Sequence, residues 1–250
     1  MSATKLCIDW GNSLVKIALF DQNDKLFEKY SLQPDEVLEQ LHKEIAPRRT
    51  FSGIILSSVT QQHNELLNAL KELCSNVVVL TKNTPLPILN AYSSGAAFGA
   101  DRVAMACAAH AAYPNKNNLV VCIGSCITYN FIGSNRTFRG GAIAPGYPMR
   151  LKAMHQNTDL LLEVKAQGDV MLIGFDTESG MRAGAYYGVL AEIDGMIAMY
   201  EAQFRDFNAI LTGGDAPQFA SKLKSKIFAD PDILMKGLLQ ILKHNVPQAR

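Results

Sequence analysis

One arrangement of strands and turns occurs twice in this chain, and it constrains the fold more than any other feature of the sequence. Residues 5–9 form an apolar segment that ends in a Gly-Asn-Ser turn, and residues 14–20 resume the apolar pattern before a second turn and a further strand. The same succession returns at 119–123, 126–132 and 137–143. Short turns between strands predict antiparallel hairpins. We therefore expect two similar halves, each of which begins with hairpin-linked strands.

Helical and strand-like segments alternate after each of these hairpins. The predicted helices are 34–44, 64–73, 101–112, 147–158, 179–204, 216–223 and 233–243, and the further predicted strands are 53–59, 76–80 and 209–211. Strands separated by helices pair in parallel through crossover connections. The predicted fold class is therefore α/β with mixed sheets. The two halves meet near residues 113–118, which gives a predicted N-terminal domain of 1–115 and a C-terminal domain of 116–250.

The composition excludes several classes of protein. Of the 250 residues, 48% are apolar and 19% are charged, as in a compact globular protein rather than a disordered one. The formal net charge of +1 gives no electrostatic basis for binding nucleic acid or an anionic membrane. The longest apolar runs, such as 170–175, have the length of a strand and fall short of the roughly 18 residues of a bilayer span. The five cysteines show no metal-binding spacing and no secretory signal precedes Asp9, so we expect a cytoplasmic protein.

Three turns of small or polar residues follow predicted strands, and the first carries a carboxylate. This first turn consists of Asp9, Trp10, Gly11, Asn12 and Ser13, with Lys16 shortly after it. A carboxylate at a strand end beside a glycine turn can hold a hydrated Mg²⁺, while backbone N–H groups and a hydroxyl face phosphate oxygens. The same composition also occurs in ordinary hairpin turns, so the turn alone leaves both interpretations open.

The other two turns lie in the second half of the chain. Gly124 and Ser125 stand among apolar neighbours, where an ordinary structural turn is the simpler interpretation. Gly213 and Gly214 separate a predicted strand from a predicted helix. Glycines there let the backbone approach a flat ligand, and a helix N-terminus favours an anion. Paired glycines also occur for packing alone.

The order of the three turns resembles the plan of the acetate kinase, sugar kinase, Hsp70 and actin superfamily, and no Walker-type motif competes with it. Within that superfamily the chain resembles type III pantothenate kinase over nearly its whole length. The matching stretches are Asp9-x-Gly11-Asn12-Ser13-x-x-Lys16, Gly99-Ala100-Asp101-Arg102, Gly140-Gly141-Ala142-Ile143-Ala144-Pro145-Gly146, His155-x-x-Thr158, 177–184, Thr212-Gly213-Gly214, and Asp230-Pro231-Asp232 with Gly237-Leu238. The Gly-x-Asp-Arg and Gly-Gly-x-Ile-x-Pro-Gly segments are the most diagnostic.

The resemblance implies a fold, an activity and a set of partners. It implies two ribonuclease H-like halves with an ATP cleft between them. It also implies ATP-dependent phosphorylation of pantothenate to 4′-phosphopantothenate, the first step of coenzyme A biosynthesis. The implied cofactors are ATP, Mg²⁺ and a monovalent cation, K⁺ or NH₄⁺. A homodimer is implied as well, and the glycines of the long helix at 179–204 offer a close-packing face that suits such an interface.

The resemblance also assigns roles to individual residues. Asp101 would be the base that accepts the proton of the pantothenate hydroxyl. The structural alternative is that Asp101 only caps the helix that begins there, which is a common role for an aspartate. Arg102 would bind the pantothenate carboxylate, with a surface ion pair as the alternative. Asp9 would bind Mg²⁺ through water, and Gly213 and Gly214 would contact adenosine. The implied phosphate contacts are Gly11, Asn12, Ser13, Lys16, Gly124, Ser125 and Thr128. The other implied pantothenate contacts are Tyr92, Gly99, Ala100 and Thr177, with Thr177 reaching the substrate from across the dimer interface.

The chain departs from the family at the second phosphate turn. Cys122 stands where the family has an aspartate associated with the cation, Ser125 stands for a threonine, and Asn130 stands for a later aspartate. A thiol is mostly neutral near pH 7 and is a poor ligand for a hard cation. We therefore expect weak or absent binding of the monovalent cation at Cys122.

Three functions remain open from the sequence. The first is an active pantothenate kinase. The second is a catalytically impaired relative that binds nucleotide or pantothenate in a regulatory role, which Cys122 and Asn130 favour and which Asp9, Asp101 and Arg102 oppose. The third is a kinase of the same fold that acts on another small alcohol.

Overall fold

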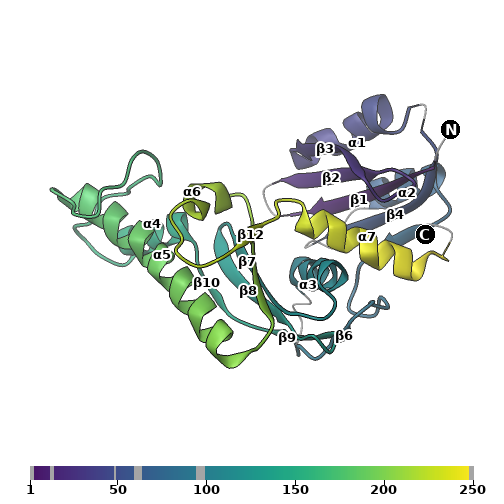
Figure 1. Ribbon diagram of the computed structural model, residues 1–250. Helices are drawn as coiled ribbons and strands as arrows, with labels where there is room; N and C mark the ends of the chain where they lie inside the picture. Colours follow the sequence, from purple (N-terminus) through teal and green to yellow (C-terminus); the bar gives the residue numbers. More distant parts are fainter. Residues whose placement is uncertain (1–2, 12–13, 48, 59–63, 94–98, 248–250) are drawn as a thin grey trace. The chain divides into compact units, whose positions relative to one another are not determined.

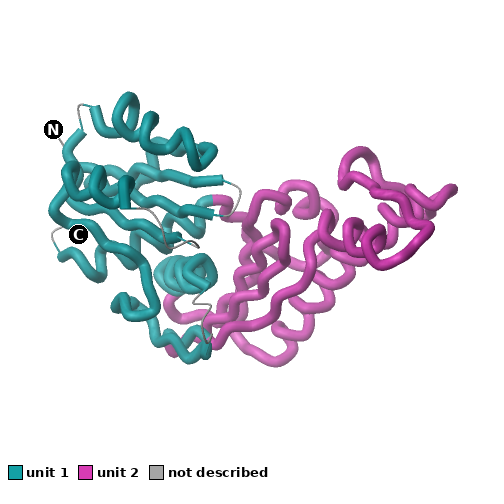
Figure 2. The backbone as a smooth tube through the Cα atoms, turned by 180° about the vertical axis from the view of Figure 1, so that it is seen from behind, with its two compact units in different colours: residues 1–112, 136–138, 232–250 teal, residues 113–135, 139–231 magenta. Residues whose placement is uncertain are grey.

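A computed structural model describes the chain except for residues 1–2, 12–13, 48, 59–63, 94–98 and 248–250. The chain forms two compact units, coloured separately in Figure 2. Unit 1 comprises residues 1–112, 136–138 and 232–250, and unit 2 comprises residues 113–135 and 139–231. The C-terminal residues are thus grouped with the N-terminal ones, while the functional division at 115 stays a prediction. No helix among the described residues is long and apolar enough to cross a membrane.

Unit 1 is built on a five-stranded sheet in the order β3-β2-β1-β4-β5 (Figure 1). The strands are β1 (Thr4–Trp10), β2 (Val15–Phe20), β3 (Leu26–Leu32), β4 (Phe51–Ser58) and β5 (Val77–Val79). The first three strands form antiparallel hairpins, and β4 and β5 join in parallel. This mixture of hairpins and crossover connections is the one predicted from the alternation of segments.

The helices of unit 1 bury their apolar residues against this sheet and against one another. The segment predicted as one helix at 34–44 consists of three consecutive turns of different pitch, namely η1 (Pro34–Glu36), α1 (Val37–Gln40) and η2 (Leu41–Ile45). Its residues Val37, Leu41 and Ile45 enter one core cluster with Leu66 and Leu70 of α2 (Asn64–Leu73). The alanine-rich α3 (Ala100–Ala112) packs along α7 (Ile233–Asn245).

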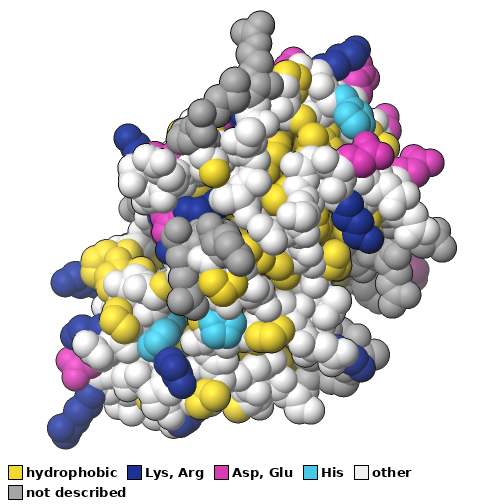
Figure 3. Space-filling model, turned by 90° about the vertical axis from the view of Figure 1, so that its right-hand side faces the viewer, with side chains coloured by type: hydrophobic (Ala, Val, Ile, Leu, Met, Phe, Trp, Pro, Cys, Tyr) yellow, Lys and Arg dark blue, Asp and Glu magenta, His cyan; other side chains and the backbone are white. Residues whose placement is uncertain are grey.

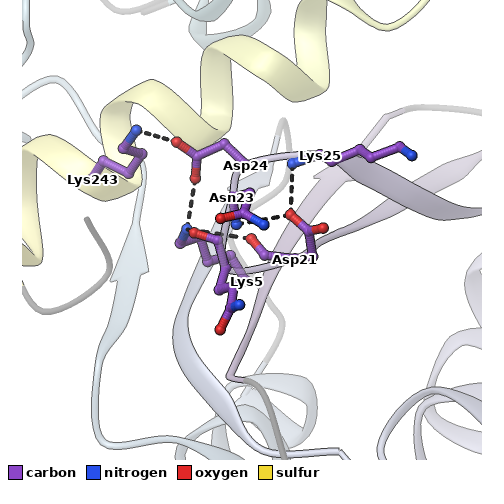
Figure 4. Close-up of polar contacts among 7 residues, drawn as sticks. Lys5, Asp21, Asn23, Asp24, Lys25 and Lys243 are labelled. Atoms are coloured by element: carbon purple, nitrogen blue, oxygen red, sulfur yellow. Dashed lines mark hydrogen bonds and ion pairs between the residues drawn. The ribbon is translucent and has the colours of Figure 1, made fainter.

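Asp24 of the β2–β3 turn links the buried Lys5 of β1 to Lys243 of α7 in unit 1. The side chain of Lys5 is 3% exposed, and its Nζ donates to Asp24 Oδ1 at 2.6 Å and to two backbone carbonyls of the turn (Figure 4). The second carboxylate oxygen of Asp24 accepts from Lys243 of α7. Burial raises the pKa of Asp24, but the hydrogen bonds from Lys243 and Lys5 outweigh it and hold that pKa below 3.8. One carboxylate therefore compensates two lysines.

Unit 2 repeats the strand order of unit 1. Its strands are β7 (Asn117–Ile123), β8 (Cys126–Ile132), β11 (Phe207–Thr212), β12 (Phe228–Ala229) and the second half of β9 (Thr137–Gly140), whose first two residues are grouped with unit 1. The strand order is β12-β11-β7-β8-β9. β7 and β8 are antiparallel, whereas β11 pairs in parallel with both β7 and β12. The repetition confirms two similar halves of the ribonuclease H-like type.

One predicted strand of unit 2 is wrong in its extent. The segment 137–143 is divided into β9 and β10 (Ile143–Pro145), and β10 pairs with β8 instead of continuing β9. The division falls at Gly140 and Gly141, which have φ values of 85° and 139°. A Cβ at Gly141 would lie 2.0 Å from the carbonyl oxygen of Tyr129, so the chain can turn there only because the residue is glycine.

The helices of unit 2 cover one core cluster. They are α4 (Tyr147–Gln156), α5 (Thr177–Gln203) and α6 (Ala216–Ala220), the last of which ends three residues earlier than predicted. The cluster includes Tyr147, Tyr186 and Phe219, and the rings of Tyr186 and Phe219 stack at 4.8 Å. This packing fixes α4 and α6 beside the ends of β7 and β11.

Two further features are a short strand that was not predicted and the distribution of charged side chains on one face. A two-residue strand, β6 (Leu89–Asn90), pairs in parallel with the start of β9 and was not predicted. On the face drawn in Figure 3, basic and acidic side chains are scattered among apolar ones, without a continuous basic stripe among the residues described there.

Candidate active site

Asp9 lies at the end of β1, where the sheet of unit 1 places a lysine and a serine beside it. In the sheet register Asp9 is opposite Lys16 of β2 and Ser57 of β4. Burial and the negative charge of Asp101 raise the pKa of Asp9 from 3.8 to about 6, against the opposing effects of Lys16 and a hydrogen bond from Ser57. The predicted residues Asp9, Lys16 and Asp101 are thus brought together in unit 1.

The turn that follows Asp9 is closed by its own backbone. The N–H of Gly11 donates to the carbonyl of Leu14 at 3.2 Å. A Cβ at Gly11 would come within 3.0 Å of that same oxygen. Asn12 and Ser13 lie outside the described residues, so their predicted contacts with phosphates stay predictions.

Asp101 stands in the first turn of α3. The helix begins after Gly99, whose φ is +59° and whose carbonyl accepts from the N–H of Val103 at 3.1 Å. Asp101 is half-buried. Its electrostatic effect on Asp9 shows that the two carboxylates are near enough to repel each other. A cation or a proton at this position would relieve that repulsion.

Arg102, the next residue of α3, is buried against an aromatic ring. Only 4% of Arg102 is exposed, and its Nη1 donates to the phenol oxygen of Tyr92 at 3.0 Å. The guanidinium carbon lies 4.8 Å from the centre of the Tyr92 ring, which makes an edge contact with Phe138 at 5.8 Å. Two of the residues predicted to bind pantothenate, Tyr92 and Arg102, therefore contact each other directly, and Arg102 is buried rather than exposed on the surface.

The second phosphate turn follows β7 in unit 2. Its Gly124 N–H donates to the carbonyl of Cys126 at 3.0 Å, and the carbonyl of Ser125 accepts from the N–H of Gly146 at 3.0 Å. A Cβ at Gly146 would lie 2.1 Å from the oxygen of Gly124. The Gly-Gly-x-Ile-x-Pro-Gly segment thus supports the Gly124–Ser125 turn from behind.

Cys122 and Asn130 lie on adjacent strands near this turn. Cys122 is half-buried and is in register with Thr128 of β8 and Thr212 of β11. The side chain of Asn130 is fully buried, and its amide nitrogen donates to Thr128 Oγ1 at 3.0 Å and to the carbonyl of Val120 at 3.2 Å. Thr128, which was predicted to meet phosphates, therefore accepts a hydrogen bond from the side-chain amide of Asn130.

The Gly213–Gly214 turn, which was predicted to meet adenosine, packs directly on Ile123, the residue before the Gly124–Ser125 turn. Gly213 has a φ of +103°, and a Cβ there would lie 2.1 Å from the carbonyl oxygen of Ile123. The N–H of Asp215 donates to the same oxygen at 3.1 Å. In contrast, a Cβ at Gly214 would meet no atom within 4 Å. The first glycine is thus required for packing, and only the second faces open space that a ligand could fill.

The Gly124–Ser125 turn and Asp215, which follows Gly214 directly, border a cavity of about 510 Å³ in unit 2. Its lining residues are Gly124, Ser125, Pro148, Met149, Lys152 and Asp215. Burial raises the pKa of Asp215 above its usual value of 3.8. The three residues of α4 in this lining were not predicted from the sequence. The Gly-Gly-x-Ile-x-Pro-Gly motif that leads into α4 was the available signal.

Thr177 is the first residue of α5 and is exposed. The helix is capped by Asp176, whose Oδ1 accepts from the N–H of Ser179 at 2.7 Å. The residues just before it have no regular secondary structure and expose large apolar side chains, namely Met171, Leu172, Ile173 and Phe175. The strand-sized run at 170–175 is therefore not buried in a sheet of the described chain.

The described residues fit one of the implied cations and not the other. A Mg²⁺ ion is bound in proteins by one or two carboxylates together with waters and substrate phosphates. The half-buried Asp9 with its raised pKa fits that role. No group of three or more His, Cys, Asp or Glu residues that could hold a metal occurs in the described parts of the chain. A monovalent cation at Cys122 would find a thiol and the N–H-bearing amide of Asn130, a set that lacks the expected carboxylates.

A comparison with solved structures identifies the fold class of the chain. The chain is similar to a conserved putative Baf family transcriptional activator from Campylobacter jejuni, with a TM-score of 0.61 at 22% identity over 96% of this chain and 98% of that one. It is also similar to Lmo2764, a putative N-acetylmannosamine kinase from Listeria monocytogenes, with a TM-score of 0.53 at 13% identity over 99% and 100% of the two chains. These likenesses define the actin-like and sugar-kinase-like ATPase fold.

The family follows from the sequence comparisons. A sequence model of type III pantothenate kinase matches residues 5–199. A type III pantothenate kinase of Bacteroides fragilis (strain ATCC 25285) is 40% identical over 241 residues, covering 96% of this chain and 98% of that protein. One from Christiangramia forsetii is 38% identical over 245 residues, covering 97% and 99%. The chain belongs to the type III pantothenate kinase family.

Proposed function

We propose that this chain phosphorylates pantothenate with ATP to give 4′-phosphopantothenate, the first step of coenzyme A biosynthesis. The observation that carries the proposal is the membership of the family over nearly the full chain, with Asp9, Asp101 and Arg102 all present. The relatives found in the sequence comparisons do not favour the catalytically impaired alternative, for which Cys122 and Asn130 were the supporting residues in the sequence.

The chemistry that we assign to α3 needs little covalent participation from the protein. Phosphoryl transfer depends on alignment, neutralisation of charge and a group that accepts the proton of the attacking alcohol. Asp101 is the proposed base, because a carboxylate at the start of α3 can orient the pantothenate hydroxyl. Arg102 and Tyr92 are the proposed partners of the pantothenate carboxylate and chain, since their contact presents a buried, pre-oriented guanidinium. Gly99 and Ala100 would lie against the same substrate.

Nucleotide and Mg²⁺ are assigned to the turns of both units. Asp9 would hold Mg²⁺ through water, and the neighbouring Lys16 would act as a point charge toward phosphate. The metal, when bound, neutralises phosphate charge. Gly11, Asn12 and Ser13 are proposed to contact phosphates, and Gly124, Ser125 and Thr128 are proposed to do so from unit 2. Gly214, with open space at its Cβ position, supports placing adenosine over the Gly213–Gly214 turn.

We further propose that the active form is a homodimer that joins copies along α5. A Cβ at Gly180 or at Gly184 would meet no other atom within 4 Å, so this stripe of the helix is uncovered in the single chain. The exposed apolar residues at 171–175 precede it directly. In such a dimer Thr177 would contact the pantothenate bound to the partner, which is the role that the family resemblance implies for it.

The cysteines bear on the monovalent cation and on the compartment. We expect no dependence on K⁺ or NH₄⁺, because Cys122 and Asn130 replace the carboxylates of the family near Thr128.

We also expect the enzyme to act in the cytoplasm. All five cysteines lie among the described residues and no disulfide joins them, as in a reducing compartment.

The test is an assay of the purified chain for release of ADP, coupled to a spectroscopic readout, with ATP and Mg²⁺. We expect release only when pantothenate is added, and a product with the mass of pantothenate plus one phosphoryl group. Release that does not depend on pantothenate, or that follows another small alcohol instead, would overturn the proposed substrate. Binding of pantothenate and nucleotide without turnover would favour the regulatory alternative.

A further inference from the structure

One face of α4 lines the cavity beside the second phosphate turn, and the family motifs in the sequence do not include it. Pro148, Met149 and Lys152 are related by steps of one and four residues, so their side chains lie on one side of the helix. Opposite them, the cavity of about 510 Å³ is bounded by Gly124, Ser125 and Asp215. Pockets of this volume are typical of small-molecule sites.

The orientation of this face is fixed by contacts on the other sides of α4. Tyr147 and Leu151 are each 1% exposed in the core of unit 2. Arg150 turns away from the cavity, because its Nε donates to the carbonyl of Pro145 at 2.9 Å and its Nη2 pairs with Glu192 of α5. Glu192 also accepts from the hydroxyl of Tyr129 at 2.9 Å. The helix therefore cannot rotate to remove Lys152 from the cavity without breaking these contacts.

The lining is chemically divided. Lys152 is its cation, and Ser125 and Asp215 are its other polar side chains. Met149, which is 41% exposed, and Pro148 provide apolar surface. A ligand that combines a polyanion with a flat apolar ring would match such a lining, because an ammonium binds phosphate oxygens and a thioether packs well against aromatic faces. A nucleoside polyphosphate has both parts.

We infer that α4 supplies a wall of the nucleotide site in which Lys152 binds the polyphosphate and Met149 packs against the base. The inference rests on the proposed placement of the nucleotide at the Gly124–Ser125 and Gly213–Gly214 turns. It adds two binding residues and divides their tasks. Lys152 binds the negatively charged phosphates of the nucleotide. Met149 contacts the base without hydrogen bonds and so does not distinguish one purine from another.

The test is calorimetric titration of the full chain with ADP and, separately, with adenosine. Lys152→Gln should weaken binding of ADP about tenfold, as expected for a lost charge-assisted hydrogen bond, and leave binding of adenosine unchanged. Lys152→Arg should retain most of the affinity for ADP. Met149→Gln should weaken ADP and adenosine to the same extent. Lys226→Gln, an exposed lysine of unit 2 outside the cavity lining, is the matched control and should change neither.

A further variant separates this inference from the placement of the nucleotide. Gly214→Val adds a side chain whose Cβ would meet no atom of the chain within 4 Å, so we expect the variant to fold and to impair binding of ADP wherever the nucleotide covers that turn. If Gly214→Val impairs binding and Lys152→Gln does not, the inference about α4 is wrong and the placement stands. If neither variant affects binding of ADP to a chain that does bind it, both the placement and the inference are wrong.

Discussion

The guanidinium of Arg102 lies over the ring of Tyr92, with its central carbon 4.8 Å from the ring centre and Nη1 donating to the phenol oxygen at 3.0 Å. Arg102 is almost completely buried, so this charge is held in place by the ring before any substrate binds. Binding of a carboxylate to such a fixed guanidinium costs less entropy than binding to a mobile arginine, because the side chain is already ordered. The pair is therefore suited to selecting an anionic substrate.

Arg102→Lys should raise the KM for pantothenate about 10- to 100-fold and lower kcat less. A lysine keeps the charge but loses the paired N–H groups that suit a carboxylate. Tyr92→Phe, which removes only the acceptor oxygen, should have a smaller effect in the same direction. Steady-state kinetics with pantothenate as the varied substrate provides the measurement. Arg49→Lys, a partly buried arginine that pairs with Glu28, is the control, and an unchanged KM in Arg102→Lys would move the carboxylate contact elsewhere.

The activity should fall at low pH because of Asp9. The pKa of Asp9 is raised to about 6 by burial and by Asp101, and its carboxylate form is the one that can hold Mg²⁺. We expect kcat/KM for ATP to decrease as the pH falls through about 6, with a slope near tenfold per pH unit. Lys16→Gln removes a charge that lowers this pKa, so it should move the midpoint to higher pH. A profile that is flat from about pH 5 to pH 7 would contradict the role of Asp9.

Cys122→Asp should create a response to K⁺ or NH₄⁺ that the parent lacks. The variant restores a carboxylate in register with Thr128 and Thr212, whereas Cys122→Ser adds a neutral oxygen and should give no response. The rate is measured against K⁺ for the three proteins, with a melting curve for each, because an unpaired buried carboxylate would cost several kcal/mol. Strong activation of the parent by K⁺ would show that the cation site exists without this carboxylate.

Asp24→Asn should destabilise the protein by about 2 to 3 kcal/mol at neutral pH, since the variant leaves the buried Lys5 without its counter-charge. The pKa of Asp24 is lowered in the folded protein, so its contribution is full above about pH 4 and is lost as the pH falls through the folded value. Urea unfolding of both proteins at several pH values should show a difference that shrinks in acid. Glu39→Gln, in an exposed pair with Lys43, is the control and should leave stability unchanged. An equal difference at every pH would contradict the account.

Local patterns in the sequence were sufficient to predict most of the helices and strands. The predicted helix at 64–73 coincides with α2, because its apolar residues recur at helical spacing and Leu66 and Leu70 are buried. The repeated hairpins were also predicted correctly, since short polar turns determine antiparallel pairing locally. The positions of Asp9 and Asp101 at element ends followed from the same patterns.

Features that depend on distant contacts could not be predicted. Gly141 interrupts a predicted strand because its backbone approaches Tyr129, which no local pattern reveals. The two-residue strands β6 and β12 are defined by their neighbours rather than by their own composition. In the sequence Lys152 and Met149 cannot be told from ordinary helix residues, because only the packing of α4 places them at a cavity.

In the reaction that we propose, Asp101 accepts the proton of the pantothenate hydroxyl, and the variant Asp101→Asn removes this base. An amide keeps the shape of the side chain and loses the base. Single-turnover measurement of 4′-phosphopantothenate should show a loss of about 10²- to 10⁴-fold, with pantothenate binding retained in a parallel titration. Asp35→Asn, an exposed aspartate of η1, should turn over like the parent. A rate for Asp101→Asn within a few-fold of the parent would contradict the account.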